Sequence, residues 1–92
     1  MANVVTRRAS DYEITVDDEH AGQAVFVEKA GAVVFTHTKI EEAFGGKGLG
    51  GELARAALDD VRSRGLGVVP ECSFIKAWID KHPEYGDLVR SP

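Results

Sequence analysis

Apolar side chains recur with two different periods along the chain, and the change falls near its middle. In the first half they alternate with polar ones, as in Tyr12, Ile14 and Val16, which is the two-residue period of a half-buried strand. The pattern predicts strands over residues 12–16, 23–29 and 32–37. Because the links between these strands are short, an antiparallel meander is favoured.

The second half of the chain has the spacing of helices. Leu49, Leu53 and Ala57 recur every four residues, which predicts one helical face through about residue 64. The rest of the chain predicts a strand over residues 66–69, a helix over residues 72–81 and a last helical turn near residues 85–89. A helix between the third and fourth strands requires a crossover, so those two strands should lie parallel.

Together the patterns predict an α+β fold in the order β-β-β-α-β-α, with an antiparallel three-strand meander, a parallel fourth strand and C-terminal helices. Residues 1–10 are expected to form an N-terminal tail. Residues 11–92 are expected to form a single domain, because a chain of 92 residues suits one compact core.

Composition narrows the class of protein. The net charge of −4 argues against nucleic acid or an anionic membrane as the main partner. No apolar stretch approaches the ~20 residues of a membrane span. The single cysteine, Cys72, excludes an intrachain disulfide and a Cys-rich zinc site. We therefore expect a small soluble cytoplasmic domain without a membrane or nucleic-acid partner, and no metal, since the acidic stretch 17–20 has the composition of a solvated turn.

Half of the glycines lie in one short segment. Residues 45–51 read Gly-Gly-Lys-Gly-Leu-Gly-Gly and directly precede the first predicted helix. Without Cβ atoms, backbone N–H groups can converge on an anion, and a helix N-terminus adds about half a positive charge. A diphosphate is the natural ligand of such a loop. The alternative is a tight turn in which glycine only permits a positive φ.

Two common phosphate-binding motifs do not explain this glycine loop. The nucleotide P-loop is excluded, because no Gly-Lys-Ser/Thr follows a four-residue gap. Gly46, Gly48 and Gly51 match the dinucleotide fingerprint literally, with Glu71 about twenty residues further on. That fingerprint should follow directly from a strand and needs a doubly wound sheet, for which the chain is too short.

The element order and four motifs resemble the coenzyme A-binding core of the GNAT superfamily of N-acetyltransferases. The motifs are residues 35–38, the glycine loop, residues 68–74 and residues 82–88. They look like a small single-domain subfamily of about this length, and the similarity covers about residues 11–90. In the superfamily's Gln/Arg-x-x-Gly-x-Gly/Ala loop, Gly48 and Gly50 take the two small positions, whereas Gly45 replaces the usual Arg or Gln.

The resemblance implies a cofactor and a set of site residues. Acetyl-CoA or coenzyme A would bind at Gly45, Gly46, Lys47, Gly48, Leu49, Gly50 and Gly51. The resemblance also implies that His37 and Cys72 are active-site groups. Histidine is suited to act as a general base, and a cysteine that opens a helix has its pKa lowered if it is exposed.

We expect His37 and Cys72 to face one another across the split between the third and fourth strands. Cys72 would then be either a transient acetyl acceptor or a pocket residue in a direct transfer. Tyr85 is a weaker candidate for protonating the CoA thiolate. Lys47 is either a contact to a CoA phosphate or a solvated lysine, and the candidates for contacting the adenosine 3′-phosphate are Arg55, Arg62 and Arg64.

Two functions from different classes fit these observations. The first is an N-acetyltransferase acting on an unidentified amine, either a small molecule or a protein lysine. The alternative is a non-catalytic module that binds coenzyme A or acetyl-CoA as a sensor or interaction domain. The N-terminal helices that wall the acceptor pocket of full-sized superfamily members have no counterpart between the predicted strands, so an open acceptor site is expected.

Overall fold

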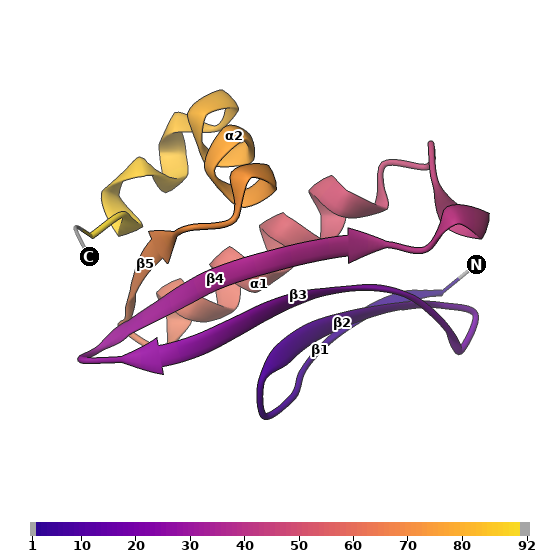
Figure 1. Ribbon diagram of the computed structural model, residues 1–92, viewed down its shortest axis with the longest axis horizontal. Coiled ribbons are helices and arrows are strands. Elements are labelled where there is room, and N and C mark those ends of the chain that lie inside the picture. The colour runs from indigo at the N-terminus through magenta and orange to yellow at the C-terminus, as the bar shows by residue number, and fades with distance from the viewer. Residues whose placement is uncertain (1, 91–92) are drawn as a thin grey trace.

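A computed structural model, which describes residues 2–90, shows one mixed sheet with its two α-helices packed together (Figure 1). The five strands lie in the order β1-β2-β3-β4-β5. They are β1 (Asn3–Arg7), β2 (Asp11–Val16), β3 (Glu19–Lys29), β4 (Ala32–Ile40) and β5 (Gly67–Pro70). Neighbours from β1 to β4 are antiparallel and β5 pairs with β4 in parallel, which confirms the predicted α+β fold with its parallel crossover.

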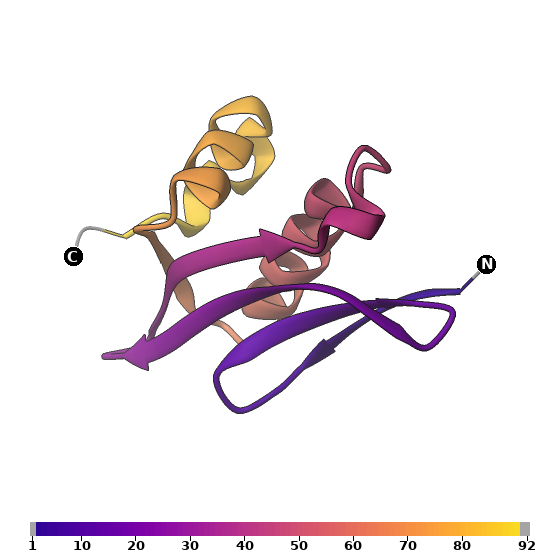
Figure 2. The same ribbon diagram turned by 45° about the vertical axis from the view of Figure 1, so that its right-hand side comes forward.

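The helices follow the predicted pattern closely. They are α1 (Leu49–Ser63) and α2 (Ser73–Lys81), with short 3₁₀ turns η1 (Glu42–Phe44) and η2 (Pro83–Leu88). The glycine loop joins η1 to α1 at the end of β4, and α2 lies above β4 and α1 in both ribbon views (Figures 1 and 2). None of the helices within residues 2–90 is long and apolar enough to cross a membrane.

The first strand corrects the expected N-terminal tail. Asn3–Arg7 pairs with β2 along its whole length, so the tail predicted for residues 1–10 is wrong over this segment. Two side chains of β1 also reach α1: Asn3 Nδ2 donates to Glu52 Oε1 at 3.0 Å, and Arg7 Nη1 contacts Asp60 Oδ2 at 2.8 Å. The strand is thus held by backbone pairing and polar contacts.

One face of the sheet packs on α1 and carries the core. Tyr12, Phe26 and Phe35 are buried there with ring centroids 5.2–6.2 Å apart. The Tyr12 hydroxyl donates to Asp60 Oδ2 at 2.5 Å. Burial, followed by this hydrogen bond, raises the pKa of Tyr12 to about 12, so the phenol stays protonated and remains a donor. This bond fixes α1 against the strands.

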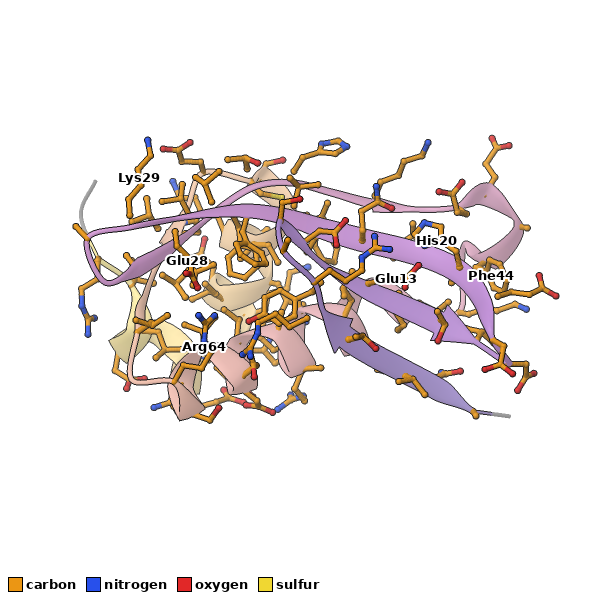
Figure 3. All side chains as sticks on the ribbon, turned by 90° about the horizontal axis from the view of Figure 1, so that it is seen from below. Glu13, His20, Glu28, Lys29, Phe44 and Arg64 are labelled. Atoms are coloured by element: carbon orange, nitrogen blue, oxygen red, sulfur yellow. The ribbon has the colours of Figure 1, made fainter. Side chains whose placement is uncertain are left out.

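The opposite face of the sheet is open. Val27 on this face is 44% exposed, and Lys29 projects from it on the side away from α1 (Figure 3). On the other side, Glu28 pairs with Arg64 at the end of α1. The meander therefore separates a covered inner face from an outer face that side chains of β2, β3 and β4 expose.

Candidate functional site

Strand β5 pairs along its whole length, but only with the first four residues of β4. Their last paired residues are Phe35 and Pro70, after which the Cys72 amide donates to the Phe35 carbonyl at 2.8 Å. The chain then turns into α2, while β4 continues to Ile40. Within residues 2–90, the edge of β4 beyond Phe35 therefore has no strand partner on the β5 side.

A β-bulge lies at the same point of β4. Phe26 pairs with Phe35, but the next pair is Val25 with His37, so Thr36 has no partner in the register. Such a bulge shifts the side-chain alternation of the strand by one residue, and bulges are frequent next to active sites. The free edge and the bulge together mark this end of β4 as the candidate site.

The start of α1 lies beside this edge and has unpaired donors. Gly48 is the N-cap of α1 with φ 73° and forms no side-chain cap. The first backbone N–H of this turn with a partner is that of Glu52, which donates to the Gly48 carbonyl. Within residues 2–90, the N–H groups of Leu49, Gly50 and Gly51 donate to no protein acceptor. Such groups bind side-chain caps, water or a ligand, and the helix dipole favours an anion among these.

Two separate structural requirements explain why glycine occupies these positions of the loop. Gly46 and Gly48 have φ of 78° and 73°, the left-handed region that other residues rarely adopt. Gly50 and Gly51 let α2 approach α1: a Cβ at Gly50 would lie 2.7 Å from the Phe74 ring, and one at Gly51 would lie 3.3 Å from the Trp78 nitrogen. The turn alternative thus accounts for part of the cluster, and helix packing accounts for another part.

Phe74 of α2 lies beside the glycine loop of the candidate site. It is an apolar residue of α2, yet 40% of it is exposed. Its ring lies against Gly50 in the first turn of α1. An exposed aromatic ring beside the glycine loop was not predicted from the helical spacing.

Cys72 is buried at the beginning of α2 and contacts β4. Only 6% of the residue is exposed, and it is the N-cap residue of the helix. Its thiol donates to Thr38 Oγ1 at 3.2 Å. Thr38 pairs with Ala24 of the core, so the thiol lies on the inner, α1-facing side of the sheet.

His37 lies on the other side of the sheet. It is exposed and pairs with Val25, which shares the open face with Val27. The structure therefore brings His37 and Cys72 to the same stretch of β4 but on opposite faces, and the hydrogen-bond partner of Cys72 is Thr38 rather than His37. The bulge at Thr36 causes this arrangement, because the extra residue moves His37 from the inner face to the outer face and Thr38 from the outer face to the inner face. The sequence alone gives no indication of this bulge.

The three candidate arginines differ in how far they are engaged. Arg62 forms a bidentate pair with Asp87, and Arg64 pairs with Glu28, so both charges are used within the fold. Arg55 donates to the Tyr85 hydroxyl at 3.2 Å and lies over the Trp78 ring at 5.4 Å from its centroid.

Lys47 and Tyr85 have equally distinct surroundings. Lys47 in the exposed loop lies over the Phe44 ring, 5.7 Å from its centroid. The Tyr85 hydroxyl donates to Asp59 at 2.6 Å, and this hydrogen bond is the main reason why the pKa of Tyr85 is raised. Tyr85 therefore serves to hold η2 on α1, and it is not a free proton donor.

The acidic hairpin between β2 and β3 does not gather metal ligands. His20 Nδ1 contacts Glu13 Oε2 at 2.6 Å, and Nε2 lies 3.6 Å from Glu41 (Figure 3). Within residues 2–90, no group of three or more His, Cys, Asp or Glu side chains is placed to hold a metal ion.

Comparison with known proteins identifies the family. The sequence model described as GCN5-related N-acetyl-transferase matches residues 11–88. The fold is similar to the NMR solution structure of a protein from Staphylococcus aureus described as a "GCN5-like putative N-acetyltransferase", with a TM-score of 0.74, 21% identity, and coverage of 97% of this chain and 89% of that one. No curated protein matches the chain. Since the family match spans most of the sequence, the chain belongs to the GCN5-related N-acetyltransferase family.

Proposed function

We propose that this protein binds acetyl-CoA between the start of α1 and the free edge of β4, and transfers the acetyl group to a primary amine. The observation that carries the proposal is the position of three unpaired N–H groups, those of Leu49, Gly50 and Gly51, beside the point where β4 and β5 diverge. The family match supports an acetyltransferase in general, and this geometry supports a place for the cofactor.

The residues at the start of α1 fit a diphosphate. Free N–H groups and the helix dipole favour an anion there, and no side chain caps the helix. Lys47 is the cation within the loop. Gly45, which replaces the usual Arg or Gln, contributes no side-chain donor, so backbone groups carry most of the recognition.

The free edge of β4 fits the rest of the cofactor. Residues 36–40 continue past the end of β5, and an extended chain bearing amide groups can pair with an exposed strand edge. The inner side of this edge carries Thr38 and Cys72, whereas the outer side carries His37. An amine that approaches from the open face would therefore meet His37 first.

Acetyl-CoA supplies an activated thioester: the amine nitrogen bonds to the acetyl carbon as the carbon–sulfur bond breaks, and the departing thiolate takes up a proton from the new ammonium. An amine is protonated at neutral pH, so one proton must leave it before the nitrogen can attack. His37, exposed on the open face, accepts that proton as the general base.

Direct transfer is favoured over an acetylated cysteine. The Cys72 thiol is buried and donates to Thr38, and within residues 2–90 it forms no hydrogen bond with His37 or another base that would activate it. We expect Cys72→Ala to retain at least about a tenth of the activity, since a nucleophile of a covalent mechanism would cost far more. Steady-state CoA release measures this, with Thr38→Val as the matched change at the partner. An acetyl-thioester on Cys72, trapped by mass spectrometry, would contradict direct transfer.

An NMR titration combined with an activity assay tests the proposed function. Acetyl-CoA is expected to shift the backbone amide resonances of residues 46–51 and 36–40, and CoA release should depend on an added amine. Shifts without amine-dependent release in a broad amine panel would support the non-catalytic module instead. Absence of shifts at residues 46–51 would reject the cofactor site.

A further inference from the structure

A groove of about 400 Å³ lies on the open face of the sheet, near the β3–β4 hairpin and away from the glycine loop. Val34 and Val69, neighbours across β4 and β5 and each only 7% exposed, form its apolar floor. Lys29, Glu71 and Arg90 line it as charged residues. The groove thus combines an apolar floor with charges of both signs.

The charges are separated along the groove. Lys29 pairs with Ala32 at the hairpin end, and Ala32 is the β4 partner of Gly67. A Cβ built on Gly67 would touch the Arg90 side chain, so Arg90 lies at the same end. Glu71 follows β5 at the other end, where its N–H donates to the Val69 carbonyl and the chain turns toward α2.

These three charged side chains have no oppositely charged partner in the part of the chain that the structure describes. The Arg90 Nη1 group donates to the main-chain carbonyls of Asp87 and Val89, but among residues 2–90 none of Lys29, Glu71 and Arg90 forms an ion pair. Charges of both signs at the two ends of one apolar groove favour a ligand with the complementary pair.

The Glu71 end adjoins the proposed reaction centre. Glu71 directly precedes Cys72, whose amide bonds to Phe35 where β4 and β5 diverge. His37, the proposed base, lies on the same face of the sheet as Val34. A group held at Glu71 is therefore the part of a ligand closest to the point of transfer.

We infer that this groove is the acceptor site and that the acceptor is an ω-amino acid, a linear amine with a carboxylate at its far end. The inference rests on the proposed function. The ammonium group lies beside Glu71, the methylene chain covers Val34 and Val69, and the carboxylate lies between Lys29 and Arg90. A diamine places a second cation against these two basic residues, which disfavours it.

A matched series of acceptors tests this assignment. The series consists of 8-aminooctanoate, octylamine and 1,8-diaminooctane. We expect kcat/KM to be highest for 8-aminooctanoate and to exceed the value for the diamine by about tenfold to a hundredfold. Shorter and longer amino acids locate the optimum length. Lys29→Glu and Arg90→Glu should lower the rate with the amino acid and raise the rate with the diamine. Lys81→Glu, the same charge change at the end of α2, is the control and should leave their ratio unchanged.

Three results would overturn the inference: equal or faster acetylation of the diamine, an unchanged ratio in Lys29→Glu, or preference for a lysine within a peptide over the free amino acid. Absence of acetylation with every amine would reject the proposed function instead. In that case, methyl NMR still tests the groove. Aminooctanoate, but not the diamine, should shift the methyl resonances of Val34 and Val69, and failure to do so would reject the ligand class.

Discussion

Replacing His37 by glutamine is expected to lower kcat/KM for the amine by about 10²- to 10⁴-fold, the range that a positioned general base contributes. Glutamine keeps a polar side chain of similar reach on the open face but cannot take up a proton at neutral pH. Because His37 lies on the face opposite Cys72, acetyl-CoA affinity should change by no more than about twofold. Steady-state CoA release and calorimetric titration measure the two quantities.

The neighbouring Lys39 provides the matched control. It is exposed and follows His37 by two residues on β4, so it lies on the same face. Lys39→Gln should leave kcat/KM within about threefold of the unchanged protein. Full activity of His37→Gln with all amines would show that another group, or solvent, accepts the proton.

Replacing Gly48 by aspartate is expected to weaken acetyl-CoA binding on the order of 100-fold, since a unit charge about 5 Å from another costs roughly 3 kcal/mol near a protein surface. The new carboxylate would lie beside the unpaired N–H groups of α1, where the diphosphate is proposed to bind. Aspartate is among the residues that tolerate a positive φ, so the loop conformation is retained. Calorimetric titration with acetyl-CoA checks the loss.

Gly48→Asn is the control for Gly48→Asp, because it separates the effect of the added charge from the effect of the added side chain. Asparagine tolerates the positive φ equally and has nearly the same volume, but it adds no charge. We expect its acetyl-CoA affinity to stay within about tenfold of the glycine protein and its thermal midpoint to match that of Gly48→Asp. Equal losses in both variants would mean that the loop's conformation, and not a bound anion, is what Gly48 serves.

The period of apolar residues was sufficient to predict most of the fold. Its change from two to about four near the glycine loop located four strands and both α-helices within a few residues. Strand β1 was missed because the pattern of exposed and half-buried side chains in Asn3–Arg7 contains no buried stripe. Its place in the sheet depends on backbone pairing with β2 and on contacts with α1 more than 45 residues away, as between Asn3 and Glu52, which no local pattern encodes.

The sequence indicated which residues belong to the candidate site, but it did not indicate how their side chains are arranged. The loop and the two motif residues His37 and Cys72 do come to one end of β4, but their placement on opposite faces depends on the unpaired Thr36. Likewise the spacing of the glycines does not show that Gly50 and Gly51 accommodate α2. In both cases the decisive contact joins elements that are separate in the sequence.

The division of the sheet into a covered and an open face also bears on how such a domain can diversify. Among the residues proposed to hold the cofactor, Leu49 is buried, and an added side chain at Gly50 or Gly51 would disturb the packing of α1 against α2. Residues proposed to hold the acceptor, such as Lys29 and Glu71, are exposed side chains on strand ends and carry little of the folding energy. Acceptor preference can therefore drift by single substitutions while the cofactor site is inherited intact, which suits a small scaffold to serve many amines.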